Sequence, residues 1–359
     1  MDKYWIWLSS VPGMNAVAFD RLINAFGSPQ AVWTEKRSSL ERFLPAALLN
    51  ALLKVRSREW AETLFESLEK HHVTCITRTD EGYPSLLLEI YDPPPTLFVR
   101  GNCEFSSERN LAVVGTRRPT RDGRRAAREL SRAIATQNVT IVSGLAMGID
   151  AEAHRGALEA GGRTVAVLPC GTDNIVPREN ADLAMEILEN GGSLITEFPP
   201  GTRVYPSSYP IRNRIISGLC PASLIVEGGF KSGAMVTANL ALEQSREVFA
   251  VPGSIYSETS HGPNSLIAAG APLVENEWSI LEPMGWASQS TTPKAAAPVI
   301  SLSEEEELIV SPLRNEFMNI EELSEYTKIP YERLNFLLTM LELKGIIIKV
   351  TGNGYRAVQ

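Results

Sequence analysis

Glycine-rich turns that carry arginine and lysine give this chain residues suited to holding phosphate. The turns lie at residues 115–118, 143–148, 169–173 and 227–233, and each follows an apolar run and precedes a helical pattern. In a parallel α/β sheet such turns gather at one edge, where free backbone N–H groups and helix N-termini attract an anion. The sequence predicts a phosphate site, and the phosphate could belong to a nucleotide or to a nucleic-acid backbone.

The candidate phosphate ligands fall into three groups along the chain. They are Gly115, Arg117 and Arg118; Ser143 and Gly144; and Arg212, Asn213, Arg214, Phe230, Lys231, Ser232, Gly233 and Thr237. An aromatic residue beside basic residues is typical of single-strand binding, where bases stack on the ring and cations attract the backbone. Phe230 could do this, or it could pack under its loop, and the sequence leaves both interpretations open.

A stripe of arginines follows the first group. Arg121, Arg125, Arg128 and Arg132 recur at helical spacing after Thr120, a plausible N-cap, and fall within one narrow face of the helix. Residues 109–132 contain eight arginines against Asp122 and Glu129. Charge runs are usually solvated helix faces, but arginine without lysine is also favoured for bidentate phosphate contacts.

Signs of catalysis are sparse. The order of a Walker loop is absent, and arginines and a proline follow Gly115 where a dinucleotide fingerprint needs glycines. His154 with nearby acids could do acid–base work, although a structural hydrogen-bonding cluster is the favoured interpretation. The four cysteines have no metal-like spacing, so we expect no metal, no cofactor and no catalytic residue.

Apolar runs alternate with helical patterns beyond the proline-rich residues 91–95. Runs at residues 111–115, 139–143, 164–168, 193–196, 223–226, 247–251 and 272–274 predict buried parallel strands. The fold class expected is α/β, an extended Rossmann-like, doubly wound and mostly parallel sheet over residues 81–284.

Two smaller domains are expected to flank this sheet. Residues 1–80 predict a small helical domain resembling a SAM or helix-hairpin-helix module, whose Pro12-Gly13 hairpin could bind duplex DNA or simply turn a helical bundle. Residues 285–301 are expected to be a linker, and residues 302–359 a winged helix with three helices and a β-hairpin. Residues 285–359 hold seven Lys/Arg against ten Asp/Glu, which favours protein contact or regulation over duplex binding.

Bulk composition narrows the class of protein. The net charge of −8 argues against a protein whose whole surface is basic, but it allows a local basic groove. The N-terminus lacks a signal-peptide pattern, and no apolar run is long enough to span a membrane. We expect a cytoplasmic location and no membrane partner.

Several ordered motifs resemble the DNA-processing protein A (DprA/Smf) family. They are Gly115-Thr116-Arg117, SGLAMGIDAEAHRGAL at 143–158, Glu197-Phe198-Pro199-Pro200-Gly201, RNRIISGL at 212–219, Lys231-Ser232-Gly233 with Thr237-Ala238, and Val251-Pro252-Gly253. They cover residues 83 to 281 in the order of the family. Departures such as Thr116 for a usual serine and Cys220 for a serine remove no positive charge.

The resemblance implies a non-enzymatic protein that binds single-stranded DNA, protects incoming strands and loads the RecA recombinase in natural transformation. It implies a pocket at Arg117, Lys231 and the adjoining glycine turns. It also implies a homodimer formed through residues 264–274, where Leu266, Ile267 and Leu273 could provide an apolar patch.

One enzymatic alternative uses the same sheet. A Rossmann-like phosphoribohydrolase would place a catalytic glutamate beside a glycine loop, and Glu227 and Glu243 lie near in sequence. The residues after Thr237 (Ala238, Asn239, Leu240 and Ala241) include no acid, so the helical turn that would hold a catalytic glutamate in such an enzyme lacks one.

Overall fold

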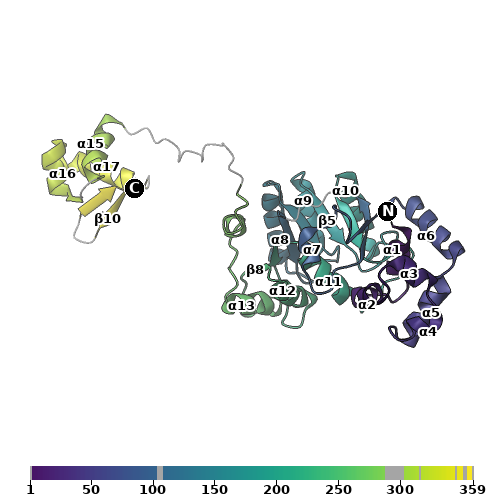
Figure 1. The fold of residues 1–359 in the computed structure, drawn as a ribbon. Coiled ribbons are helices and arrows are strands. Elements are labelled where there is room, and N and C mark those ends of the chain that lie inside the picture. Colours follow the sequence, from purple (N-terminus) through teal and green to yellow (C-terminus); the bar gives the residue numbers. More distant parts are fainter. Residues whose placement is uncertain are drawn as a thin grey trace. The chain divides into compact units, whose positions relative to one another are not determined.

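The chain forms two compact units, residues 1–288 and residues 289–359 (Figure 1). The structure, a computed structural model, describes residues 2–102, 108–287, 303–314, 317–343, 346–350 and 354–357. Most of the expected linker, from residue 288 to residue 301, lies outside these residues. Its first residues belong to the larger unit, because the buried Trp286 donates its indole N–H to the carbonyl of Glu108 at 3.0 Å.

The larger unit is built on one eight-stranded sheet in the order β1-β2-β6-β5-β4-β3-β7-β8. The strands are β1 (Val73–Thr77), β2 (Thr96–Gly101), β3 (Asn110–Val114), β4 (Thr140–Ser143), β5 (Thr164–Val167), β6 (Ser193–Thr196), β7 (Ala222–Ile225) and β8 (Glu247–Ala250). Strands β3 to β8 pair in parallel, whereas β2 pairs antiparallel with both β1 and β6. The predicted mostly parallel sheet is confirmed.

Six of the seven predicted apolar runs form strands, because they are buried on both faces of the sheet. The seventh, at residues 272–274, makes only an isolated bridge between Leu273 and Ala250. Strand β1 was not predicted and lies within the segment expected to be helical. Its sequence, VTCIT, is interrupted by threonines and therefore contains no continuous apolar run.

Helices cover both faces of the sheet. On one face lie α8 (Arg121–Ala135), α9 (Ile149–Glu159), α10 (Ala181–Glu189) and α14 (Trp278–Leu281), and on the other α7 (Ser85–Leu88), α11 (Ser208–Gly218), α12 (Gly233–Glu243) and α13 (His261–Ala268). Short 3₁₀ turns stand at Arg178–Asn180 and Glu258–Ser260. Alternate residues of β3 belong to different cores, Leu111 and Val113 to one and Ala112 and Val114 to the other. The sheet is therefore doubly wound.

Six helices precede β1. The first five share a core around Trp7, Phe19 and Leu22, whereas the sixth buries Leu64 and Leu68 against Ile6, Cys75 and Phe98. The six helices are α1 (Lys3–Ser9), α2 (Ala16–Phe26), α3 (Pro29–Thr34), α4 (Arg37–Leu40), α5 (Ala46–Val55) and α6 (Arg58–Lys70). Asn15 caps α2 by accepting the N–H of Ala18, and Gly27, at a positive φ of 82°, ends it.

The smaller unit contains three helices and a three-stranded antiparallel sheet in the order β10-β11-β9. Its elements are α15 (Glu304–Leu313), β9 (Met318–Asn319), α16 (Ile320–Thr327), α17 (Tyr331–Leu343), β10 (Ile347–Val350) and β11 (Gly354–Ala357). The three predicted helices and the two hairpin strands are confirmed. The turn at residues 351–353 lies outside the described residues.

Candidate functional site

The carboxyl ends of β3 and β7 open into a cavity of about 360 Å³. Strand β3 is followed in space by β4 on one side and by β7 on the other, so the order of the strands reverses here. Ligands of open α/β sheets bind at such a switch point. The cavity is lined by Val114, Gly115, Thr116, Arg117, Arg118, Ala146, Asp150, Tyr209, Arg212, Asn213, Ile216, Ser232, Gly233, Ala234 and Thr237.

The turn after β3 places two arginines at the cavity. Gly115 is required there, because a Cβ atom would lie 2.4 Å from the side chain of Ile149. Thr116 donates its N–H to the carbonyl of Glu227 at 2.7 Å, which fixes the turn to the next glycine loop. Arg117 and Arg118 follow with exposed side chains, and these two cations are free to meet an anion.

Glu227 has a structural role at the start of helix α8. Its carboxylate accepts the N–H and the hydroxyl of Thr120, at 2.9 and 2.6 Å, at the start of α8. Gly123 leaves room for it, since a Cβ atom would lie 2.3 Å from the carboxyl carbon. The N-terminus of α8 therefore already holds an anion of this chain. Neither Glu227 nor the exposed Glu243 lines the cavity, and Asp150 is the one carboxylate that does so among the residues described.

Arg212 forms a buried wall of the cavity. Its Nη1 donates to the carbonyls of Gly144 and Val167, at 2.6 and 2.5 Å. A Cβ atom on Gly144 would lie 2.1 Å from that nitrogen, so glycine is needed there. Burial lowers the pKa of Arg212, and the nearby Asp150 opposes that effect.

Asp150 accepts two N–H groups of the glycine turn after β4, including that of the predicted phosphate ligand Gly144. Its Oδ2 accepts the N–H of Gly144 at 3.2 Å and of Ala146 at 3.4 Å. Burial raises the pKa of Asp150, while Arg212 and these two N–H groups act in the opposite direction. The expectation that the Gly144 N–H contacts phosphate is therefore wrong, because a carboxylate of the chain takes it.

The start of α12 forms the opposite side of the cavity. Ser232 caps the helix by accepting the N–H of Met235 at 3.4 Å. The carbonyl of Gly233 accepts the hydroxyl of Thr237 at 3.2 Å and the amide of Asn213 at 3.4 Å, so these two side chains support the loop. The N–H groups of Gly233 and Ala234 stand at the first two helical positions, where a helix offers no internal acceptor.

Phe230 and Lys231 lie next to the cavity lining on the same loop. The Phe230 side chain is 64% exposed, and its ring centroid lies 5.5 Å from that of His261 at an interplanar angle of 30°. Phe230 thus does not pack under its loop. Lys231 is exposed beside it and makes no ion pair within the described part of the chain.

Arg214 and Ser143 lie away from the cavity. Arg214 is buried and pairs with Asp92 at 3.0 Å and with Glu197 at 2.6 Å. Residues two apart on a helix point about 200° apart, so α11 directs Arg214 away from Arg212. The Ser143 hydroxyl donates to the buried carbonyl of Val113 at 2.6 Å. The sequence analysis grouped Arg214 with Arg212 because they are two residues apart, but helix α11 points their side chains in different directions.

Tyr209 and Asp150 are two of the lining residues that were not predicted as site residues. Tyr209 precedes the basic run, and the guanidinium carbon of Arg117 lies 4.7 Å from its ring centroid. Asp150 follows the glycine turn in the first turn of α9. An aromatic before a basic run and an acid just after a glycine turn are the signals that could have found them.

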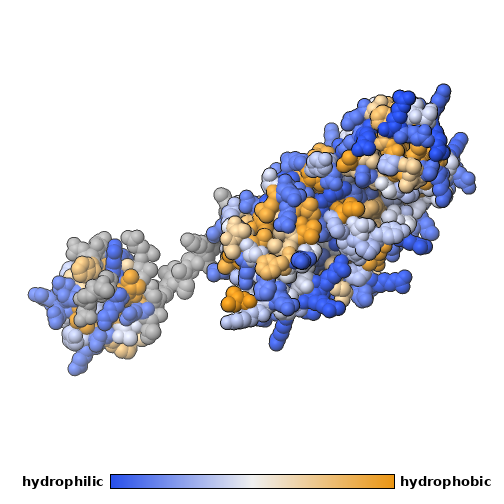
Figure 2. Space-filling view, turned by 90° about the horizontal axis from the view of Figure 1, so that it is seen from below, coloured by the Kyte–Doolittle hydropathy of each residue, from blue (hydrophilic) through white to orange (hydrophobic). Residues whose placement is uncertain are grey.

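The predicted dimer residues differ in exposure. Leu266 is buried in the core under α13, Ile267 packs partly against that core, and Leu273 is 40% exposed. Only Leu273 presents a large apolar surface. Figure 2, seen from below the view of Figure 1, shows apolar residues of the larger unit gathered in patches between polar ones.

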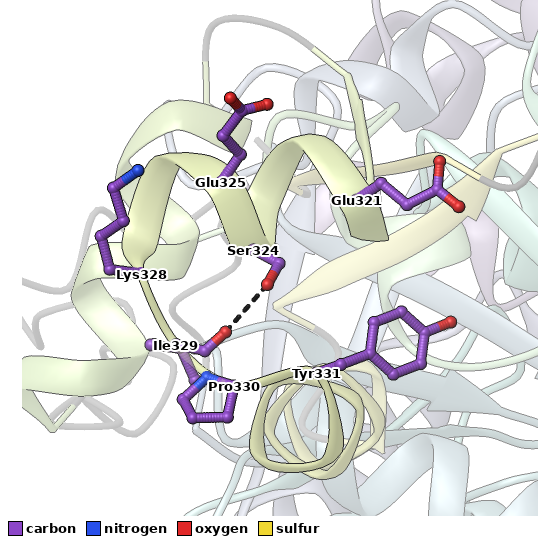
Figure 3. A pocket seen from close by; sticks show the side chains of 7 residues that line it. All are labelled: Glu321, Ser324, Glu325, Lys328, Ile329, Pro330 and Tyr331. Atoms are coloured by element: carbon purple, nitrogen blue, oxygen red, sulfur yellow. Dashed lines mark hydrogen bonds between the residues drawn. The ribbon is translucent and has the colours of Figure 1, made fainter.

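The smaller unit carries an open hollow beside α16 (Figure 3). Glu321, Glu325 and Lys328 project from α16, and Tyr331 begins the next helix. The hydroxyl of Ser324 donates to the carbonyl of Ile329 at 3.0 Å and closes the turn between the two helices.

In the part of the chain that the structure describes, no cluster of His, Cys, Asp and Glu side chains is arranged to hold a metal ion. The helices of that part are all too short or too polar to cross a bilayer. His154 is fully buried, with Nδ1 2.7 Å from the hydroxyl of Thr164, and it does not line the cavity. The geometry supports its structural interpretation.

The fold and the cavity define an α/β protein with an arginine-lined crevice at the switch point of a doubly wound sheet. The sequence model of the family described as DNA recombination-mediator protein A matches residues 74–285, and the chain belongs to this family.

Relatives of known sequence cover much of the chain. It is 47% identical over 212 residues to Protein Smf of Escherichia coli, a match that spans 59% of this chain and 56% of that protein. It is 35% identical to Protein Smf of Synechocystis, over 79% of this chain and 73% of that protein. It is 42% identical to the DNA processing protein DprA of Bacillus subtilis, over 58% and 71%.

Two solved structures share the fold. DNA processing protein A of Streptococcus pneumoniae superposes with a TM-score of 0.68 at 30% identity, covering 79% of this chain and 98% of that chain. DNA processing protein A of Helicobacter pylori, described for its single-stranded DNA binding mode, has a TM-score of 0.54 at 29% identity, covering 60% and 97%.

Proposed function

We propose that this protein binds single-stranded DNA through its phosphates, at the cavity between β3 and β7, without catalysing a reaction. The observation that carries the proposal is the meeting of the exposed Arg117 and Arg118 with the first turn of α12 across one cavity. The single-stranded DNA binding of the Helicobacter pylori relative supports it.

Each part of the site has a role in this proposal. Arg117 and Arg118 neutralise phosphates with charge-assisted hydrogen bonds, and the N–H groups of Gly233 and Ala234 bind phosphate oxygen. Lys231 attracts the backbone beyond the cavity. Arg212 contributes a fixed positive charge behind the site, because its Nη1 is held by the carbonyls of Gly144 and Val167.

Phe230 offers a stacking surface for a base. Its exposed ring stands against His261, beside Lys231, so a strand whose backbone lies in the cavity can place a base on the ring. Stacking accepts every base, which makes binding tolerant of sequence.

The cellular role proposed is that of a recombination mediator. It would protect incoming single strands and load RecA during natural transformation, acting in the cytoplasm as a homodimer with Leu273 in the contact. We also assign the smaller unit to the winged-helix class, from its order of three helices and three strands, and the helices α1 to α6 to a helix-hairpin-helix-like module.

Titration of a labelled oligonucleotide at several salt concentrations tests the proposal. Affinity should fall steeply with salt, because each phosphate neutralised releases a counterion. Arg117→Ala and Lys231→Ala should each weaken binding by about 1 kcal/mol or more, as for a charge-assisted hydrogen bond. Salt-independent binding would refute phosphate recognition, and unchanged affinity in both variants would place the site elsewhere.

The phosphoribohydrolase alternative gains no support from the geometry. Of the two glutamates considered for it, Glu227 accepts hydrogen bonds from Thr120, the N-cap of α8, and Glu243 is exposed and does not line the cavity. Release of free base from nucleoside monophosphates by the purified protein would revive it.

A further inference from the structure

Five exposed arginines of α8 lie together outside the cavity. Arg121, Arg124, Arg125, Arg128 and Arg132, here called the α8 arginine face, line one hollow with Glu129, Glu152 and Glu159. The opposite side of α8 is buried through Ala127, Leu130 and Ile134. The helix is thus anchored by its apolar side and presents guanidinium groups outward.

Three of these arginines make no ion pair with a described residue, although the charge of Arg132, after that of Arg128, helps to lower the pKa of Glu159. Arg125 pairs with Glu129 at 3.0 Å on the surface, and Arg128 pairs with Glu152 and Glu159 of α9. Arg121, Arg124 and Arg132 make no ion pair with any residue that the structure describes, and their charges remain available to a ligand.

The acids of α9 approach because the two helices are in close contact. A Cβ atom on Gly156 would lie 2.2 Å from the carbonyl oxygen of Arg128, so glycine permits this distance. The resulting pairs hold Arg128 in place between the free arginines on either side. They reduce the positive charge of the face without cancelling it.

The face continues from the cavity. Arg117 and Arg118 line the cavity and directly precede α8, whose arginines run on from Arg121 to Arg132. At 1.5 Å per residue this run is about 16 Å long. Phosphates of one strand are about 3.4 Å apart along a duplex axis and farther apart on an extended strand, so the run accommodates about three to five of them.

The composition of the face favours a nucleic-acid backbone over an acidic protein. Apart from Ala126 and Ala133, the residues of α8 that are not buried are charged, namely Arg121, Asp122, Arg124, Arg125, Arg128, Glu129 and Arg132. Protein interfaces are centred on aromatic and other apolar residues, which this face lacks. Backbone binding needs only cations in a row.

We propose that the α8 arginine face binds the phosphates of a single strand after it leaves the cavity, and so lengthens the DNA-binding site. This inference rests on the proposed function of the cavity. It predicts that the face contributes only when the strand is longer than the cavity.

The test compares oligo-dT of about 5 and about 20 nucleotides, lengths within and beyond one compact binding site. The variant is Arg121→Gln/Arg124→Gln/Arg132→Gln, which removes the three unpaired charges and keeps good helix formers. The matched control is Arg42→Gln/Lys54→Gln/Lys70→Gln, which removes three exposed charges from the helical region that precedes β1.

For the long strand, the variant should lose about tenfold or more in affinity, and the slope of log K against log salt should become shallower by about 2, or 0.7 per lost phosphate contact. The short strand should bind both variants equally. Equal affinity of the variant and the control for the long strand would overturn the inference.

Two further outcomes also overturn the inference. Loss of poly-glutamate binding with unchanged DNA binding would point instead to an acidic protein partner. Failure of the unaltered protein to bind either oligonucleotide would reject the cavity proposal itself, whereas binding that the variant leaves intact rejects only the α8 arginine face.

Discussion

The guanidinium carbon of Arg117 lies 4.7 Å from the centroid of the Tyr209 ring. Arg117 belongs to the turn after β3 and Tyr209 to the first turn of α11, so the contact crosses the cavity mouth. A cation above an aromatic face is attracted by the ring quadrupole and loses rotamer freedom. Tyr209 therefore holds Arg117 in one orientation before any anion arrives.

Replacing Tyr209 should weaken the binding of single-stranded DNA through Arg117. We expect Tyr209→Ala to reduce affinity two- to fivefold, equivalent to about 0.5–1 kcal/mol for an exposed cation–π contact. Tyr209→Phe keeps the ring and should bind as the unaltered protein does. Tyr205→Ala is the control, since Tyr205 is exposed and does not line the cavity. Equal losses for the alanine and phenylalanine variants in a titration would show that the hydroxyl, not the ring, matters.

Substitutions of Arg214 and Arg118 should have different effects, one on the stability of the fold and the other on the affinity for DNA. Removing Arg214 leaves the carboxylates of Glu197 and Asp92 without their cation, so Arg214→Met should lower the free energy of unfolding by about 3–5 kcal/mol. The exposed Arg118→Met should change it by less than about 0.5 kcal/mol and weaken DNA binding instead. Urea denaturation and oligonucleotide titration measure the two effects. An Arg214→Met variant with unchanged stability but reduced affinity would show that Arg214 takes part in DNA binding.

Arg212 and Arg214 also show what the sequence could and could not predict. Their positive charge and their place before a glycine loop are visible in the sequence, and both were assigned to phosphate. Their opposite directions follow from α11, a helix that the sequence analysis did not place there. Their partners, Gly144 and Glu197, are distant in sequence, and only the folded chain brings them together.

The fold was more predictable than the site. A buried strand such as β3 contains a continuous apolar run, Leu111 to Val114, and this signal is visible without tertiary information. Strand β1 has threonines within and at the end of its sequence, and its pairing with β2 depends on the finished sheet edge, so its sequence pattern is ambiguous. Glu227 illustrates the limit for the site, because an acid beside a glycine loop has the same sequence signal whether it acts on a ligand or, as here, holds the N-cap residue of a helix.

Two glycines of the site should respond differently to alanine. A methyl group on Gly144 would meet Arg212, so Gly144→Ala should cost about 1–3 kcal/mol of stability as overpacking does. Nothing lies within 4 Å of a Cβ atom on Gly233, and Gly233→Ala should keep or raise stability, by up to about 1 kcal/mol, in a helix. Thermal unfolding measures both.

The Gly233→Ala variant also tests whether a phosphate comes close to the first turn of α12. Its methyl group would stand in the cavity at the first turn of α12, where we place a phosphate. We expect weaker DNA binding with an undiminished Tm. Unchanged affinity would mean that phosphate does not come close to this turn.

His154 should make the protein sensitive to mild acid. Burial, together with Arg212 and Arg155, lowers the pKa of His154 to about 3. The Thr164 hydroxyl donates to the carbonyl of Ile141, so it accepts from Nδ1 of a neutral His154 ring. The unfolded chain takes up a proton near pH 6.5, whereas the folded chain does not.

The sign of the pH effect follows from that difference. Stability is full above about pH 6.5 and falls as the pH drops toward 3, with about 2 kcal/mol lost between pH 7 and pH 5. His154→Asn keeps a donor for Thr164 and cannot be protonated, so its unfolding free energy should fall less over this interval. His72→Asn, at an exposed position, should keep the behaviour of the unaltered protein. Identical pH profiles for all three proteins would exclude His154 as the cause.

Deleting residues 290–359 should leave single-strand affinity unchanged within about twofold, because the smaller unit lacks a basic surface on its best candidate helix. Helix α17 exposes Phe336 and Met340, which are 57% and 36% exposed, and has Glu332 and Glu342 on its exposed surface. Residues 285–359 carry a net charge of −3, from seven Lys/Arg and ten Asp/Glu. Since the larger unit is compact up to residue 288, its Tm should survive the deletion, and Tm is the control for folding. A large loss of affinity with an unchanged Tm would show that the smaller unit contacts DNA. It would contradict the interpretation that this unit serves only to bind a protein partner.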